Sequence, residues 1–233
     1  MRSSLHQLLL CISLFFFATI QAQNYTVLGN AVQLGGCECF RITPNAKNQA
    51  GAIFQNKTIN LNNSFDFTFS VFFGCNNGGG ADGLMFALTT NPNGLGNPGE
   101  GLGYAGNNQP FSFAVEFDTY QNSNVNDPSY HHIAFNSAGL YNHNVGGPVP
   151  AQPNSAPLDD CQNHIVRIVW DVNSNTYSVY LDGNLRLSMV IPNIVQTYFG
   201  GNPIVNWGWT AATGGGTNEQ NVCIQTTPGI ARI

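Results

Sequence analysis

The stretch Ala114-Val115-Glu116-Phe117-Asp118-Thr119-Tyr120-Gln121-Asn122, followed by Asp127 and then by His131-His132-Ile133, decides the fold of this chain. Its first part alternates strictly between apolar and polar residues. The apolar set is Phe113, Val115 and Phe117, and the polar set is Glu116, Asp118 and Tyr120. Because successive side chains of a strand point to opposite faces, the pattern predicts a strand with one apolar and one acidic face.

The acidic face needs a positively charged partner. Glu116 and Asp118 stand two residues apart, and ionised carboxylates away from water are costly unless they are paired or bind a metal. Lys and Arg together number only 7, and none lies between Lys57 and Arg167. A metal cation is therefore the expected partner, in preference to an acidic strand edge in water with a solvated histidine.

The ligand types suit two cations. One set offers only oxygens and suits Ca²⁺: Asp118, Asn122, Asp127 and the backbone carbonyl of Tyr120. The other set adds an imidazole and suits Mn²⁺ or another divalent transition ion: Glu116, Asp118, Asp127 and His132. The two aspartates shared by both sets would bridge the ions.

These residues also carry a resemblance. Glu116 to Asn122, Asp127 to Tyr130, and His132-Ile133 resemble, with matching spacing, the metal-binding stretch of the L-type (legume-type) lectins. The resemblance implies an all-β, single-domain, concanavalin-like jelly-roll β-sandwich of a secreted, bacterial-like kind. It implies Ca²⁺ and Mn²⁺ as cofactors and a glycan as partner. It also implies that Glu116 and His132 bind only the transition ion, and that Asn122 and the Tyr120 carbonyl bind only Ca²⁺.

The same resemblance implies a carbohydrate site. Ala81-Asp82-Gly83 is similar to the family motif in which the Asp follows a cis peptide bond and accepts hydrogen bonds from two sugar hydroxyls. Gly103, before Tyr104, matches a glycine whose backbone N–H donates to the sugar. Asn122 and the Tyr120 ring complete the expected contacts, and Gly215 to Glu219 lies where the family has its variable sugar loop.

The remaining sequence agrees with an exported β protein. Residues 1–22 have a positive start and an apolar run and are predicted to be a signal peptide, which leaves residues 23–233 as one domain. Short β-rich runs separated by Gly, Asn and Pro predict a sandwich. No second apolar run of spanning length follows, so we expect no membrane span after cleavage. The expected location is secreted, at the cell surface or periplasmic.

The net charge and the cysteine content indicate which classes of partner and which compartment suit this chain. The net charge of −5, with no basic patch, disfavours nucleic acid. Cys37, Cys39, Cys75, Cys161 and Cys223 predict two disulfides and one free thiol in an oxidising compartment, with the pairing open. Self-association as a homo-oligomer also stays open. His143 has no evident partner in the sequence and is predicted to be a surface histidine.

The two alternative functions belong to other classes of protein. Glucanases on the same sandwich carry Glu-x-Asp-x-x-Glu, but Gln121 stands where the last Glu would be, and an amide cannot donate a catalytic proton. The other alternative is an adhesion module that binds no sugar. The sequence therefore predicts a carbohydrate-binding protein that is not an enzyme.

Overall fold

Strand β6 (Phe65–Phe72) shows why the chain forms a sandwich. Phe67 and Phe69 are fully buried, whereas Asp66 is exposed and Thr68 and Ser70 are half-buried. The ring of Phe67 lies 4.7 Å from that of Trp207, and the ring of Phe69 lies 5.1 Å from that of Trp209. Period-two alternation on one sheet thus meets aromatic residues of another sheet and forms a shared core.

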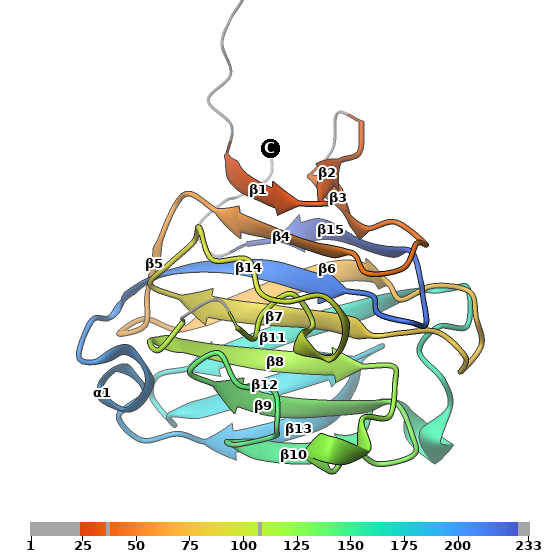
Figure 1. Cartoon of the computed structure of the whole chain (residues 1–233). Helices are drawn as coiled ribbons and strands as arrows, with labels where there is room; N and C mark the ends of the chain where they lie inside the picture. The colour runs from red at the N-terminus through yellow and green to blue at the C-terminus, as the bar shows by residue number, and fades with distance from the viewer. Residues whose placement is uncertain (1–23, 36–37, 107–108, 228–233) are drawn as a thin grey trace, which may run out of the picture.

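The computed structural model describes residues 24–35, 38–106 and 109–227. Figure 1 shows two layered sheets, and all strand pairs in them are antiparallel. The first sheet runs in the order β1 (Tyr25–Gly29), β4 (Ala50–Gln55), β14 (Ile204–Ala212), β7 (Gly83–Thr89), β8 (Ser112–Asp118), β9 (His132–Ser137), β10 (Gly146–Pro150), with β5 (Ile59–Asn60) paired to β14. The second runs β13 (Asn184–Val190), β12 (Thr176–Leu181), β11 (Asn163–Asp171), β6, β15 (Gln220–Thr226), β3 (Cys39–Thr43), β2 (Val32–Gln33).

The helical segments are short. They are α1 (Ile194–Phe199) and the 3-10 turns η1 (Gly99–Gly101), η2 (Ser123–Val125) and η3 (Pro153–Ser155). Helix α1 buries Ile194 and Phe199 at one end of the sandwich (Figure 1). Among the described residues, no helix has the length and apolarity needed to cross a membrane. The predicted all-β, single-domain, concanavalin-like sandwich is confirmed.

Strand β8 follows the predicted alternation. Phe113, Val115 and Phe117 belong to the core between the sheets, so Glu116 and Asp118 point to the opposite face. That face is also buried near the site, because Leu102 and Tyr104 of the preceding loop pack on Ala114. The strand ends at Asp118, so Tyr120, which the alternation placed on the same strand, lies in the following loop.

Two disulfides join segments that are distant in the sequence. Cys39 of β3 bonds to Cys223 of β15, and Cys75 bonds to Cys161. The two predicted disulfides are therefore present. Cys37 and the predicted signal peptide lie outside the described residues.

Candidate functional site

Two carboxylates and an imidazole meet where β8 and β9 lie side by side. Asp118 pairs directly with His132 in the antiparallel register, so their side chains share one face. Glu116 is 0% exposed, Asp118 2% and His132 1%. Ionisable groups are rarely buried this deeply without partners, so the cluster is a candidate site rather than a surface feature.

The loop after β8 brings in a third carboxylate. The Tyr120 N–H donates to Asp118 Oδ1 at 2.6 Å, and the Asn122 N–H donates to Asp127 Oδ2 at 2.7 Å. The Gln121 side-chain amide donates to the Asp127 carbonyl at 3.2 Å. These bonds fold the loop back, and Asp127 ends buried beside Asp118.

The donor atoms converge as a metal site requires. Ligand atoms of Asp118, Asp127 and His132 all lie within 4.8 Å of one another, and so do those of Glu116, His132 and His143. Glu116 Oε1 and Asp127 Oδ1 are buried and accept no hydrogen bond. Buried carboxylate oxygens that accept no hydrogen bond and lie beside an imidazole fit a divalent cation. The structure thus brings together the four predicted side-chain ligands of the transition ion.

Burial disfavours negative charge in this cluster. Burial raises the pKa of Glu116 to about 8, opposed by the hydrogen bond from Asn136 and reinforced by the charge of Asp127. Burial also raises the pKa of Asp118 well above its ordinary value, and Glu116 and Asp127 raise it further. Burial lowers the pKa of His132 to about 4. A cation would reverse this preference, because it stabilises carboxylates in their charged form.

Asp82 stands beside this cluster, immediately before β7. The Ala81–Asp82 peptide bond is cis, as the family resemblance implied. The Asp82 N–H donates to the Ala212 carbonyl at 3.0 Å, and the Thr119 N–H donates to the Asp82 carbonyl at 2.9 Å. Asp82 is thereby tied to β14 on one side and to the end of β8, next to Asp118, on the other.

The Asp82 carboxylate keeps an acceptor free. The residue is only 4% exposed, yet its Oδ2 atom accepts no hydrogen bond. Burial, followed by the charge of Glu100, raises the pKa of Asp82 to about 7, and the nearby backbone N–H of Gly214 opposes the shift. A Cβ atom added at Gly214 would lie 3.2 Å from that Oδ2 atom, so glycine keeps the approach to the carboxylate open.

A family model described as "Legume lectin beta-barrel domain" matches residues 18–226. The chain belongs to this family. The legume-type lectin resemblance carried by residues 116–133 is therefore confirmed.

Solved lectin structures share the fold of this legume-type lectin chain. The lectin from Bauhinia forficata in complex with GalNAc has a TM-score of 0.69 at 22% identity, over 88% of this chain and 92% of that chain. Lectin I-B4 from Griffonia simplicifolia in its metal-free form has a TM-score of 0.70 at 22% identity, over 90% and 93%. Basic winged bean lectin with Tn-antigen has a TM-score of 0.68 at 22% identity, over 88% and 94%.

Gly103 of this lectin chain departs from its predicted role. Its N–H donates to the Asn97 carbonyl at 3.0 Å, and the residue is buried, so this donor is already used inside the protein. Its φ is +68°, and a Cβ atom there would lie 2.7 Å from the Ala211 carbonyl oxygen. Glycine at this position lets the loop lie flat on the sheet. On this loop the Gly99 N–H donates to the Thr213 carbonyl at 3.0 Å, so Gly99 lies beside Gly214, which borders the Asp82 carboxylate.

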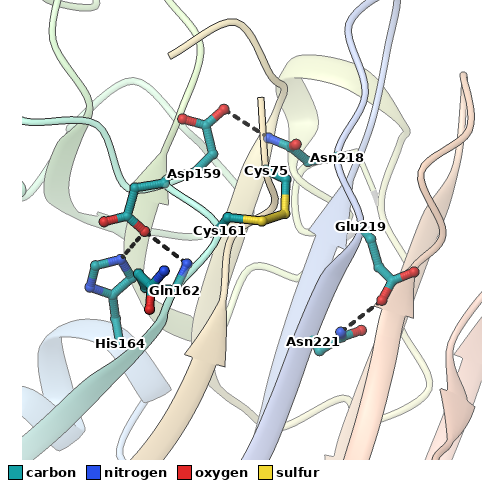
Figure 2. Close-up of a disulfide and its surroundings, with 9 residues drawn as sticks. Cys75, Asp159, Cys161, Gln162, His164, Asn218, Glu219 and Asn221 are labelled. Carbon is teal, nitrogen blue, oxygen red and sulfur yellow. Dashed lines mark hydrogen bonds and ion pairs between the residues drawn. A yellow bond between two sulfur atoms is a disulfide. The ribbon is translucent and has the colours of Figure 1, made fainter. Parts of the chain in front are cut away.

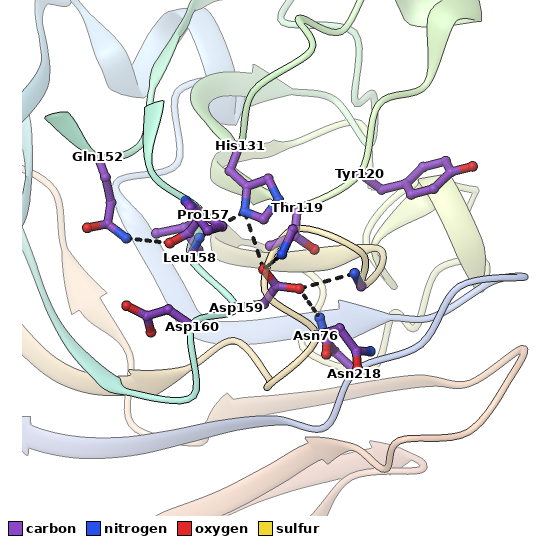
Figure 3. Close-up of polar contacts among 12 residues, drawn as sticks. Asn76, Thr119, Tyr120, His131, Gln152, Pro157, Leu158, Asp159, Asp160 and Asn218 are labelled. Carbon is purple, nitrogen blue, oxygen red and sulfur yellow. Dashed lines mark hydrogen bonds and ion pairs between the residues drawn. The ribbon is translucent and has the colours of Figure 1, made fainter. Parts of the chain in front are cut away.

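Tyr120 is exposed, as its predicted contact with the sugar requires. Its side chain lies in the loop after β8 and the residue is 48% exposed. It borders a pocket of about 330 Å³ that Thr119, Tyr130 and His131 also line. In Figure 3 the Tyr120 ring points away from the buried polar network around Asp159. The ring is therefore available to a ligand.

Asp159 is a supporting residue that sequence reasoning missed. It is fully buried, and it accepts hydrogen bonds from the backbone N–H groups of Gly78 and Gly80 and from the Asn218 side chain at 3.2 Å (Figure 3). Its Oδ1 atom lies 3.9 Å from His131 Nδ1. Asp159 thus joins the turn that precedes Asp82 to the Gly215-to-Glu219 loop.

The disulfide Cys75–Cys161 reinforces this junction, as Figure 2 shows. The Cys161 N–H donates to the Gly74 carbonyl at 2.9 Å, and the Asn76 side chain donates to the Thr217 carbonyl at 2.5 Å. The sequence offered only one hint of this junction, which is that Asp159 stands two residues before a cysteine. The three joined segments lie far apart in the chain, so local patterns carry no further signal.

We expect Asp159→Asn to loosen the turn before Asp82. An amide would direct an NH₂ group toward backbone N–H donors, and an unsatisfied buried donor costs about 1–3 kcal/mol. Chemical denaturation should show a loss of this size, and hydrogen exchange at Gly78 and Gly80 should accelerate. Asp160→Asn is the matched control, because Asp160 is only half-buried and points away in Figure 3. Equal effects in both variants would contradict the role assigned to Asp159.

His143 corrects a second prediction. The sequence indicated a surface histidine, but the side chain is only 7% exposed and lies among the buried carboxylates. A lone histidine in a Gly- and Asn-rich loop carries no periodic signal, so its burial could not be read from the sequence.

Proposed function

We propose that this legume-type lectin chain is a carbohydrate-binding protein that depends on two metal ions. Glu116, Asp118, Asp127 and His132 would hold Mn²⁺ or another divalent transition ion. Asp118, Asp127, Asn122 and the Tyr120 carbonyl would hold Ca²⁺. The ions would supply the positive charge that the buried carboxylates lack.

The loop between Asp118 and Asp127 would transmit metal binding to the ligand site. Its backbone already bonds to both carboxylates through Tyr120 and Asn122. A cation on the same carboxylates would hold this loop in one conformation. Asn122 and the Tyr120 ring, both carried by the loop, would then contact the sugar beside Asp82. The ring would pack against the apolar face of the sugar, and Asn122 would donate to a hydroxyl.

A single observation carries the proposal, which is the free acceptor on Asp82. The Oδ2 atom is buried without a partner, beside a metal-type donor cluster to which Asp82 is tied through Thr119. A carboxylate that accepts two hydroxyl donors suits the vicinal hydroxyls of a sugar. Two lectins of similar fold were solved with GalNAc and with Tn-antigen, which supports a glycan as the ligand class here.

A glycan array with and without chelator tests the proposal. We expect specific binding in the presence of Ca²⁺ and a transition ion, loss of that binding after EDTA, and recovery when both ions are restored. Wild-type protein that binds no glycan under any metal condition would overturn the proposal in favour of an adhesion module. Glycan binding that EDTA leaves unchanged would overturn the metal requirement alone.

The glucanase alternative is not favoured. Gln121 lies outside strand β8, and its amide donates to the Asp127 carbonyl, so it is occupied in shaping the loop. We propose binding without hydrolysis. Release of reducing ends from a panel of glucans would contradict this.

The proposed location rests on the N-terminus. Residues 1–22 have the features of a signal peptide, and the two disulfides suit an oxidising compartment. We propose that the protein is exported and acts outside the cell, at its surface or in a periplasm.

A further inference from the structure

The loop between β9 and β10 aims His143 at the metal cluster. The His143 N–H donates to Asn136 Oδ1 at 2.8 Å, and Asn144 exchanges two bonds with Ser137, at 3.0 and 2.8 Å. His143 has a φ of 57°, a conformation that asparagine and histidine adopt more readily than most residues. The loop is therefore tied to β9 at His143 and at Asn144, and the imidazole is directed inward.

Three metal-ligand groups surround the His143 ring nitrogen. Its Nε2 atom lies 3.0 Å from His132 Nε2, 3.2 Å from Asp127 Oδ1 and 3.7 Å from Glu116 Oε2. In the same cluster Glu116 Oε1 and Asp127 Oδ1 accept no hydrogen bond although they are buried. The two imidazole nitrogens share a hydrogen bond in this structure. With the protons on the other ring nitrogens, both would offer a lone pair to one cation placed between them and the carboxylates.

Asn136 holds two members of this set in place. Its Nδ2 group donates to Glu116 Oε2 at 2.6 Å, and its Oδ1 atom accepts the bond from the His143 backbone. Such outer-shell partners orient metal ligands in known sites. One buried amide thus fixes both a carboxylate and the loop that carries the second imidazole.

We propose that His143 is a second imidazole ligand of the transition-ion site and that it makes this site select Zn²⁺ over Mn²⁺. The proposal rests on the two-ion function proposed above and specifies its transition ion. Imidazole suits zinc, whereas carboxylate and water suit manganese, and divalent affinities generally rise from manganese toward zinc. A site with His132 alone would discriminate less strongly between the two ions.

The test compares metal affinities of the wild-type chain and of His143→Gln. Both proteins are stripped with chelator, supplied with Ca²⁺, and titrated separately with Zn²⁺ and Mn²⁺ against a competing chelator. We expect the variant to lose at least about 10-fold in Zn²⁺ affinity, since even outer-shell changes cost 10–100-fold, with a much smaller loss for Mn²⁺. X-ray absorption spectroscopy at the zinc edge should show two imidazole ligands on the ion in the wild type and one in the variant.

A control in the same loop separates ligation from loop disturbance. Asn142 is exposed and adjacent to His143, so Asn142→Ala should keep the wild-type ratio of Zn²⁺ to Mn²⁺ affinity. One imidazole at the zinc edge of the wild type, or an unchanged affinity ratio in His143→Gln, would overturn this inference and leave the two-ion function standing. Wild-type protein that binds no transition ion would overturn both.

Discussion

Asp82→Asn is expected to abolish sugar binding while metal content and melting temperature stay close to wild type. The Asp82 carboxylate has a free, buried Oδ2 atom and is not one of the groups that converge on the metal cluster. An amide offers one acceptor oxygen and turns an NH₂ group toward the second hydroxyl. Hydrogen bonds to charged groups contribute about 1.5–3 kcal/mol each, so losing one of them and the charge that strengthens the other would put a simple sugar below detection.

Glu100→Gln is the matched control for this change. Glu100 lies close enough to raise the pKa of Asp82, but its own carboxylate bonds to the Asn124 side chain at 2.9 Å. The control removes a neighbouring negative charge and leaves the Asp82 acceptors intact, so it should still bind sugar. Titration by calorimetry with a glycan that the array identifies gives the measurement. Wild-type affinity in Asp82→Asn would mean that the sugar binds elsewhere on the sandwich.

Chelation is expected to lower the melting temperature strongly at pH 8 and weakly near pH 6.5. Bound ions stabilise the native state by mass action, and the carboxylates must be ionised to bind them. Without ions, the folded-state pKa of Glu116 is about 8 against an ordinary 4.5, so the folded state holds more protons than the unfolded one in that window. Stability of the metal-free protein therefore falls as pH rises toward 8.

His132 changes the stability with pH in the opposite direction, and this sets the lowest pH of the thermal scans. Its pKa falls from 6.5 to about 4 on folding, so its contribution to stability rises between these pH values and no longer changes above about pH 6.5. Above that pH, the dependence on pH in this cluster comes from the carboxylates. Thermal scans with and without EDTA at pH 6.5, 7.3 and 8 should show the trend, and Glu116→Gln should flatten it. A melting temperature that exhaustive chelation leaves unchanged, with no metal found by mass spectrometry, would rule out the two-ion site.

The sequence by itself determined the sandwich and most of the metal cluster. Phe113, Val115 and Phe117 had to face the core because a strand alternates with period two, and the same rule put Glu116 and Asp118 together on the other face. Asp127 and His132 could be added because a short loop leads back to the adjacent antiparallel strand. Each of these inferences depends on neighbours within about one hairpin, where spacing along the chain translates directly into spacing in the fold.

Contacts between residues that are distant in the sequence were determined only by the tertiary structure. Asp159 meets Gly80 and Asn218 across separations of 79 and 59 residues, and no local pattern specifies which loops come together at one end of a sandwich. The family motif predicts that the Gly103 N–H donates to the sugar, but this N–H donates to the Asn97 carbonyl within the loop. His143 was assigned to the surface, but the bond from its backbone to Asn136 turns it inward. Periodicity determines which face a side chain takes, whereas loop hydrogen bonds determine what that side chain meets.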